Sequence, residues 1–248
     1  MSSNSIDLWL VDHFRITLFL LRPWEGPVDV AFAGIFSVLP DSVESKPNAG
    51  EHACIGNWNA QRVQFRVSLN RLDIIVGAQI PQTAQMVFVE RPFDKFAEFV
   101  LLVKNWIQGA NFEVNRFALA TNALWKVEDR ARAARKATEL AGVTISAPDE
   151  LEDVQFVYNR PISSSSVPNE KINRVVTASA LKVEIGMMID GAPTPMLSEH
   201  YSGLFTDISS RADRGSIIGY EQFLALLDEM VVEQSSIFSR GAYASVFE

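Results

Sequence analysis

The end of the chain carries its most regular hydrophobic pattern. Between Tyr220 and Arg240, apolar residues recur at spacings of three, four and seven, which places them on one stripe of an α-helix. Gly219 precedes the run and Gly241 follows it, as is typical of a helix start and stop. The pattern predicts a long amphipathic helix over 220–240 whose stripe is Tyr220, Phe223, Leu224, Leu227, Met230, Val231 and Phe238.

This apolar stripe must pack against other apolar groups, and the sequence allows two possibilities. The stripe packs against the protein's own core, or it binds a partner protein or a second copy of the chain. Leu226, Val232 and Ile237 lie off the stripe, so the apolar surface is wider than one contact requires. Further apolar residues follow the helix, which adds weight to an interface: Tyr243, Val246 and Phe247.

Strict alternation of apolar and polar residues predicts a β-hairpin in the first half of the chain. Two alternating runs flank a two-residue connection at Asn70 and Arg71, which is the pattern of paired antiparallel strands. The apolar positions are Val63, Phe65, Val67 and Leu69 in the first run and Leu72, Ile74, Val76 and Ala78 in the second.

Shorter runs predict the remaining elements. β-prone segments predict strands over 14–21, 86–89, 115–124, 154–158, 174–188 and 204–208. Helical spacing predicts one helix from Pro92 to Gly109 and a second over 127–140, ended by Gly142. Segment 28–38 fits either a helix or a strand, and Gly34 favours the strand. Residues 40–53 have the composition of a polar loop.

Strands and helices are mixed without the regular alternation of a parallel α/β protein. The order predicts an α+β fold with a mostly antiparallel sheet, packed helices and the long C-terminal helix. A length of 248 residues fits one domain over 1–248, or two tightly joined halves over 1–145 and 146–248.

Charge and cysteine content narrow the functional classes. The net charge of −8 argues against a broad basic surface for nucleic acid, although a local basic patch is compatible with it. Cys54 is the single cysteine, so an intramolecular disulfide and a cysteine-based zinc cluster are excluded. The first residues lack a signal peptide or membrane span. We expect a cytoplasmic protein without a membrane partner.

The motif Val114, Asn115, Arg116, Phe117, Ala118, Leu119, with Asn122 three residues on, resembles a strand of an uncharacterised, sporadically distributed bacterial protein family of about this length. The resemblance extends to segments 27–30, 93–107 and 205–208 and to the terminal helix ending at Ile237 and Phe238. It implies an α+β fold and a bacterial cytoplasmic protein, and it brings no catalytic residues. The sporadic distribution is compatible with a component of a phage-defence or toxin–antitoxin system.

Carboxylates in two segments are candidates for a metal site. Segment 40–46 spells the P-D…E-x-K letters of restriction-type nucleases, but that site needs its two parts on successive strands, whereas here they share one loop. The densest acidic cluster, over 149–153, lacks the glycine of an EF-hand-like turn. Solvated loops are the favoured interpretation. A metal-dependent hydrolase or nuclease would require convergence of Asp41, Glu44, Asp149 or Glu152.

His52 and Cys54 are two residues apart and share one side of a strand. Two ligands do not make a metal site, and neither His13 nor His200 has a recognisable carboxylate partner in the sequence. A catalytic cysteine would require His52 to activate Cys54, which the spacing alone does not indicate. Structural or surface roles are favoured for all four residues.

Arg130 falls on the small-residue side of the helix over 127–140, where an arginine needs a partner. An internal ion pair, or a stem lying along apolar surface, is the favoured interpretation, and a contact with an anion or an acidic partner is the alternative. The small residues around it are Ala133, Ala134, Ala137 and Ala141.

The sequence contains no phosphate-binding loop, dinucleotide glycine fingerprint, nucleophile elbow or zinc-binding helix motif, so we predict no cofactor. Its tryptophans are scattered along the chain and are expected to serve packing: Trp9, Trp24, Trp58, Trp106 and Trp125. The leading hypothesis is a non-enzymatic interaction protein that binds another protein or itself through a sheet face or the C-terminal helix.

Overall fold

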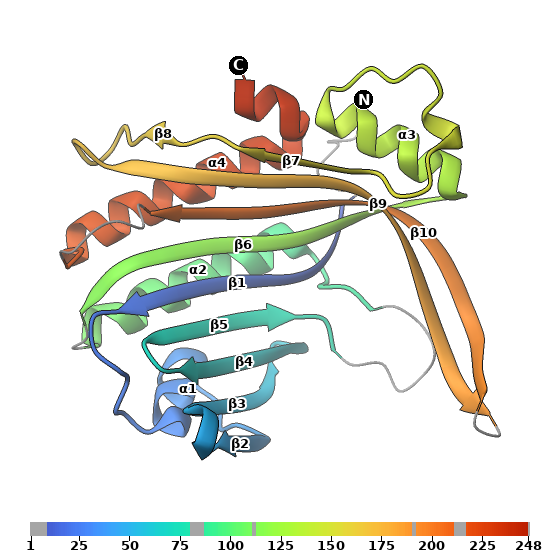
Figure 1. The fold of residues 1–248 in the computed structure, drawn as a ribbon. Coiled ribbons are helices and arrows are strands. Elements are labelled where there is room, and N and C mark those ends of the chain that lie inside the picture. Colours follow the sequence, from blue (N-terminus) through green and yellow to red (C-terminus); the bar gives the residue numbers. More distant parts are fainter. Residues whose placement is uncertain (1–8, 80–86, 111–112, 190–191, 211–216, 248) are drawn as a thin grey trace.

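The fold is α+β, with helices packed on one large antiparallel sheet (Figure 1). The computed structural model describes residues 9–79, 87–110, 113–189, 192–210 and 217–247. The described strands are β1 (Leu10–Leu20), β2 (Ser42–Lys46), β3 (Glu51–Trp58), β4 (Gln61–Ser68), β5 (Arg71–Gly77), β6 (Val114–Val127), β7 (Gln155–Asn159), β8 (Ile162–Ser163), β9 (Lys171–Ile189) and β10 (Ala192–Ser210). The α-helices are α1 (Val28–Phe36), α2 (Pro92–Gly109), α3 (Arg130–Ala141) and α4 (Tyr220–Phe247).

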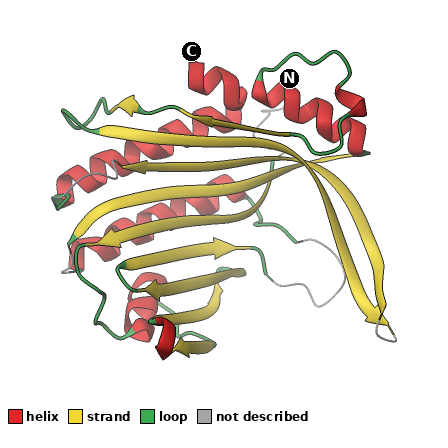
Figure 2. Ribbon diagram, in the orientation of Figure 1, coloured by secondary structure: helices red, strands yellow, loops and turns green. Residues whose placement is uncertain are grey.

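The strand order is β2-β3-β4-β5-β1-β6-β10-β9-β7, and β8 pairs with β9. Every described pairing is antiparallel. β1 lies between β5 and β6 although it is first in the chain, so its two neighbours are contributed by segments far apart in sequence. The short strands β2 and β7 form the two edges (Figure 2).

The two faces of the sheet differ in whether helices pack on them. α1, α2 and α4 lie on one face, which we call the helix face (Figure 1). On β1, the buried residues Phe14, Ile16 and Leu18 point to this side. We call the opposite side the open face, where β1 presents Arg15 and Phe19 and alternate residues of β4 are half-buried.

Aromatic pairs join the helix face to its helices. Phe14 of β1 packs against Phe96 of α2 with ring centroids 4.8 Å apart. Phe117 of β6 meets Phe223 of α4 at 4.4 Å. The Trp9 indole donates to the Phe238 carbonyl over 3.1 Å, which ties the start of the described chain to the terminal helix. These contacts place the main core between the sheet and α1, α2 and α4.

Several predicted elements are confirmed. The hairpin over 63–78 is β4–β5, although Arg71 already belongs to β5. The helix from Pro92 to Gly109 is α2. The helix predicted over 127–140 is α3, but it begins only at Arg130, since Val127 belongs to β6 and Asp129 is the N-cap residue. Its C-cap is Gly142, whose φ of 64° is left-handed. The strands predicted over 14–21, 115–124, 154–158 and 174–188 lie within or overlap β1, β6, β7 and β9.

The prediction of a strand over 28–38 is wrong, because residues 28–36 form α1. Ala31, Phe32 and Ile35 are buried on one side of this helix. Gly34 lies beside the Trp106 indole, whose nearest atom would be 3.5 Å from an added Cβ. The pattern satisfied both periodicities, and packing against the core decided between them.

The prediction of a polar loop over 40–53 is also wrong. Residues 42–46 form β2, and β3 begins at Glu51. All five residues of β2 are exposed because the strand forms an edge of the sheet. An exposed edge strand has a polar composition that resembles a loop.

Other corrections concern element ends. Residues 87–89 of the predicted strand over 86–89 are not in a strand, and Met86 lies outside the described residues. The strand predicted over 204–208 is part of the 19-residue β10, which pairs along β9. Gly241 does not end the terminal helix, since α4 continues to Phe247. A helix tolerates an interior glycine at a cost of about 1 kcal/mol.

Candidate functional site: a tryptophan-lined cleft

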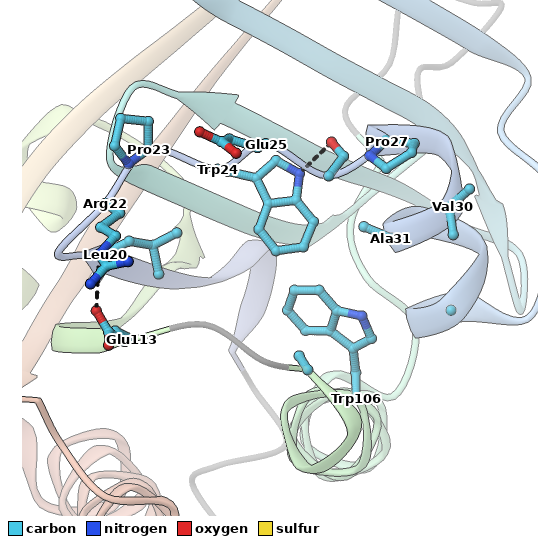
Figure 3. A pocket seen from close by; sticks show the side chains of 13 residues that line it. Leu20, Arg22, Pro23, Trp24, Glu25, Pro27, Val30, Ala31, Trp106 and Glu113 are labelled. Atoms are coloured by element: carbon cyan, nitrogen blue, oxygen red, sulfur yellow. Dashed lines mark hydrogen bonds and ion pairs between the residues drawn. The ribbon is translucent and has the colours of Figure 1, made fainter.

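A cleft of about 760 Å³ opens between the segment that follows β1 and the helices α1 and α2 (Figure 3). Its volume is in the range of small-ligand and side-chain binding sites. Because its walls come from segments far apart in the sequence, only the folded chain forms it. The lining residues are Leu20, Arg22, Pro23, Trp24, Glu25, Gly26, Pro27, Val30, Ala31, Gly34, Trp106, Ala110 and Glu113.

The segment between β1 and α1 is shaped by prolines and a glycine. Trp24 folds back on this segment, and its Nε1 donates to the Gly26 carbonyl over 2.7 Å. A Cβ at Gly26 would lie 2.6 Å from Cζ2 of the Trp24 ring, so only glycine allows this close approach. Pro27 then serves as the N-cap residue of α1. Local sequence therefore fixes the position of the Trp24 ring.

Two tryptophans form the aromatic wall of the cleft. The Trp24 and Trp106 ring centroids lie 6.1 Å apart, with the ring planes inclined at 47°. Both rings rest on Phe65 of β4, at centroid distances of 6.2 Å from Trp24 and 5.7 Å from Trp106. Because Phe65 is fully buried, it anchors the wall to the core. The pair presents a large, rigid apolar surface next to the exposed side chain of Val30.

Charged side chains lie at the rim. Nε of Arg22 is 3.5 Å from Oε2 of Glu113, and the Glu113 carbonyl accepts the Leu21 N–H over 3.0 Å. Glu25 adds a second carboxylate (Figure 3). These described charges sum to −1, because one guanidinium faces two carboxylates. The rim therefore favours a ligand that carries a positive charge beside an apolar group.

The chemistry of the described lining is that of binding. Arg22, Glu25 and Glu113 are its titratable residues, and no serine, cysteine, histidine or lysine occurs among the lining residues that the structure describes. The arrangement can hold an apolar group against the tryptophan rings and a cationic group beside the carboxylates of Glu25 and Glu113.

The seven stripe residues of the terminal helix lie against the protein's own core. Phe223, Leu227, Met230 and Phe238 are buried, and three others are half-buried against the same core: Tyr220, Leu224 and Val231. Among the off-stripe residues, Leu226 and Ile237 are buried and Val232 is 67% exposed. A partner contact through α4 stays a prediction, and in this conformation its accessible side is the one that carries Val232.

Arg130 forms an ion pair. Its Nη1 lies 2.9 Å from Oε1 of Glu152. Both side chains are exposed, so the pair is not the internal one that the sequence analysis favoured. The alanines of α3 pack separately, with Ala134 and Ala137 contacting Val154. Arg130 therefore holds the acidic loop after α3 against the start of that helix. An exposed pair of this kind contributes at most about 1 kcal/mol.

The candidate metal carboxylates lie in separate places. Asp41 accepts a hydrogen bond from Asn57 Nδ2 over 2.7 Å, and Glu44 belongs to the edge strand β2. Glu152 pairs with Arg130 near α3, which packs against β9 and β10 toward the other edge of the sheet. Asp149 lies in a short 3₁₀ turn over 148–150 that contacts α3. Within the described part of the chain, no group of three potential metal ligands converges.

The histidine and cysteine candidates lie in different environments. His52 Nδ1 lies 3.0 Å from Ser45 Oγ on the surface, whereas Cys54 is fully buried. Burial, followed by the nearby Asp29 carboxylate, raises the pKa of the Cys54 thiol, which disfavours the reactive thiolate. His13 pairs with its neighbour Asp12 over 2.8 Å, a contact that the sequence analysis did not recognise because it arises at a β-bulge.

The sequence analysis interpreted Trp24 and Trp106 as packing residues and did not assign them to a site. They are 82 positions apart by their numbering, and no local motif connects them. Only the Trp-x-Gly-Pro run over 24–27 was a signal, since Gly26 and Pro27 predict a tight turn beside an aromatic residue.

Comparison with known proteins does not identify the chain: no family model matches it, and no curated protein shows significant similarity to it. The resemblance to a sporadic bacterial family, and with it a role in defence, stays a prediction. Within the described residues, none of the helices combines the length and the apolar composition needed to cross a bilayer.

Proposed function

We propose that this chain is a non-enzymatic interaction protein whose tryptophan-lined cleft binds an apolar segment of a partner protein. The observation that supports this function is the half-buried aromatic wall of Trp24 and Trp106, which lines a preformed concave site. Tryptophan side chains in such pockets contribute disproportionately to binding energy at protein interfaces.

The wall is rigid before any partner binds. Trp24 is fixed by its hydrogen bond to the Gly26 carbonyl, and Trp106 is carried by the long helix α2. Both rings rest on the buried Phe65. A preorganised site loses little conformational entropy on binding, so more of the contact energy is retained as affinity.

The charges at the rim of the cleft favour one kind of partner segment. Glu25 and Glu113 outnumber Arg22, so a cationic side chain is favoured at the mouth of the cleft. The segment that fits best has an apolar anchor residue next to a lysine or arginine. The anchor would lie between Val30 and the tryptophan rings, and the cation would lie over a ring face or beside Glu25.

The test starts with selection of peptides from a random displayed library on the full-length protein. We expect enriched peptides to combine an apolar anchor with an adjacent basic residue. Calorimetry then compares their affinity for the wild type, Trp106→Ala and Val30→Lys. Val30 is 64% exposed, so the second variant places a charge in the cleft without removing core atoms. We expect each variant to lower the affinity by about tenfold or more.

Val232→Lys is the matched control, because Val232 has a similar exposure of 67% on α4, away from the cleft. Its affinity should equal that of the wild type. Equal binding by Val30→Lys and the wild type would contradict the proposal. So would a library selection that yields only peptides whose binding is lost in Val232→Lys, since this would place the contact on α4.

A further inference from the structure

Three arginines from neighbouring strands meet on the open face of the sheet. Arg15 belongs to β1, Arg71 to β5 and Arg116 to β6. Phe19 of β1 is directly opposite both Arg71 and Arg116 in the strand register. The guanidinium carbons of these two arginines lie 5.9 Å and 4.8 Å from the Phe19 ring centroid. The Phe19 ring therefore supports two cations on adjacent strands.

Asp73 of β5 is the carboxylate that binds within this arginine cluster. Its carboxylate accepts from Thr17 Oγ1 over 2.6 Å and from Arg71 Nη2 over 2.9 Å, and Arg71 Nε lies 2.8 Å from its other oxygen. Arg15 Nε lies 4.0 Å from the same carboxylate. The Asp73 side chain is only 8% exposed, so it is a fixed internal group that orients Arg71 and neutralises one of three positive charges.

Some guanidinium N–H donors of the cluster have no hydrogen-bond acceptor among the described residues. The Nε atoms of Arg15 and Arg116 are buried and have no hydrogen-bond partner among the described residues. Arg116 makes one side-chain hydrogen bond, from Nη2 to Ser209 Oγ over 3.3 Å. Each guanidinium offers five donors. An incoming oxyanion would bind the outer donors of these guanidinium groups, because the Arg15 and Arg71 side chains are 27% and 42% exposed.

The surrounding strands keep this part of the open face basic. β4 adds Arg62 and Arg66 on the same side, and Arg66 is paired with Glu51 over 3.1 Å. Asp207 of β10 lies on this side, and Asp12 is engaged by His13. On this side of β3, β4, β5, β1, β6 and β10, the positive groups outnumber the carboxylates by one: Arg15, Arg62, Arg66, Arg71, Arg116 and Lys126 against Asp12, Glu51, Asp73, Glu199 and Asp207. This excess contrasts with a chain whose net charge is −8.

We infer that Arg15, Arg71 and Arg116 form an anion-binding site for carboxylate groups of an acidic protein segment. The two-point contact of Arg71 with Asp73 shows that the site already accommodates a carboxylate. A long nucleic acid is disfavoured because three arginines gathered at one place cannot neutralise the many successive phosphates of its backbone. The site takes one or two carboxylates, which match its excess of two positive charges over Asp73.

Two residues of the strand motif noted in the sequence lie at or near this site. Arg116 is the arginine of the segment 114–119, and Asn122 lies on the same face six positions later, where it donates to Asp12 over 3.4 Å. The site is separate from the tryptophan-lined cleft, because consecutive residues of a strand point to opposite faces. Phe19 supports the arginines, whereas Leu20 lines the cleft.

The test titrates the full-length protein with a short polyglutamate peptide and, separately, with a polyglutamine peptide of equal length and with inorganic phosphate. We expect polyglutamate to bind, with an affinity that falls as salt is added, and polyglutamine not to bind. Arg15→Gln and Arg116→Gln should each lower the affinity for polyglutamate by about tenfold. Arg132→Gln is the matched control, since Arg132 lies on α3 and is paired with Glu128. Trp106→Ala should leave this binding unchanged.

Circular dichroism melting curves establish that each variant folds. Absence of polyglutamate binding in the millimolar range, with the wild type folded, would overturn the inference. Equal affinities of Arg116→Gln and Arg132→Gln would overturn it as well. Phosphate binding that is tighter than polyglutamate binding and is lost in Arg116→Gln would contradict the choice of carboxylate as the ligand.

Discussion

At the scale of single residues, Glu229 shows how one polar side chain fixes two segments. It lies on α4 and accepts hydrogen bonds from the hydroxyls of Ser164, Ser165 and Ser166 and from the backbone N–H groups of the last two. Partial burial opposes ionisation, but these hydrogen bonds outweigh it and lower the pKa of Glu229 to about 2. The serine run, which the sequence marks only as a turn, is thus attached to the terminal helix.

The depressed pKa predicts a dependence of stability on pH. Because the pKa of Glu229 is lower in the folded chain than its ordinary value of 4.5, the stabilisation is present above that value. It should be lost progressively as the pH falls from about 4.5 toward 2. At neutral pH we expect Glu229→Gln to lower the free energy of unfolding by about 1–2 kcal/mol, after allowance for solvent screening. Denaturant unfolding at several pH values measures this effect.

Glu221→Gln is the control for this experiment, because it makes the same chemical change at an exposed position in the first turn of α4. It should have a much smaller effect on stability. If the two variants lose equal stability at neutral pH, the serine contacts do not stabilise the fold.

At the scale of secondary structure, one glycine within α1 and one glycine that packs against α1 allow the effects of two Gly→Ala substitutions on stability to be compared. Gly34 is inside α1 with ordinary space for a Cβ, whereas a Cβ at Gly56 of β3 would lie 2.8 Å from the Phe32 ring and 3.4 Å from the Pro40 backbone. We expect Gly34→Ala to stabilise the protein by about 0.5–1 kcal/mol, because alanine is the better helix former. Gly56→Ala should destabilise it by about 1–3 kcal/mol through overpacking.

Thermal unfolding of both variants measures these opposite changes. A decrease in melting temperature for Gly34→Ala would mean that the space beside Trp106 is smaller than the structure shows. Because Gly34 and Trp106 both line the cleft, the melting temperature of Gly34→Ala also tests how much space the cleft has beside Trp106.

The terminal helix is attached to the sheet by polar contacts as well as by its apolar stripe. Glu233 pairs with the buried Arg174 of β9 over 2.7 Å. Gln234, which is 2% exposed, donates to Thr121 of β6. Buried polar contacts of this kind fix the register of an element, because a shifted helix would leave them unpaired. These interactions make α4 part of the protein's own core.

At the scale of the whole molecule, the sheet separates two surfaces. Its helix face holds the core, and its open face carries the arginine cluster. Since the stripe of α4 is covered within the chain, the described side chains of this helix, over 220–240, leave no large apolar surface that requires a second copy. The side chains of Tyr243, Val246 and Phe247 lie outside the described part of the chain. Both proposed binding sites are accessible on a single chain.

We therefore expect the purified protein to be a monomer of 27.6 kDa. Light scattering after size exclusion, over a range of concentrations, checks this expectation. A stable dimer would contradict it and would direct attention to the exposed side of α4, where Val232→Lys should then dissociate the assembly.

The sequence predicted much of the local structure. The β4–β5 hairpin and α2 follow from the periodicities of 2 and 3.6 residues, which depend only on neighbouring positions. The same rule fails where both periods fit, as in α1, or where an edge strand has the composition of a loop, as in β2. In those segments contacts with distant residues decide the conformation.

The sequence by itself determined the α+β class, the acidic net charge, the absence of a disulfide and the long amphipathic helix. Only the tertiary structure decided that this helix packs on the protein's own sheet and that Trp24 meets Trp106. It also brought Arg15, Arg71 and Arg116 together from strands that are neighbours in space and distant in sequence. The physical reason is that periodicity reports which side of an element is buried, whereas strand order and helix docking decide what covers it.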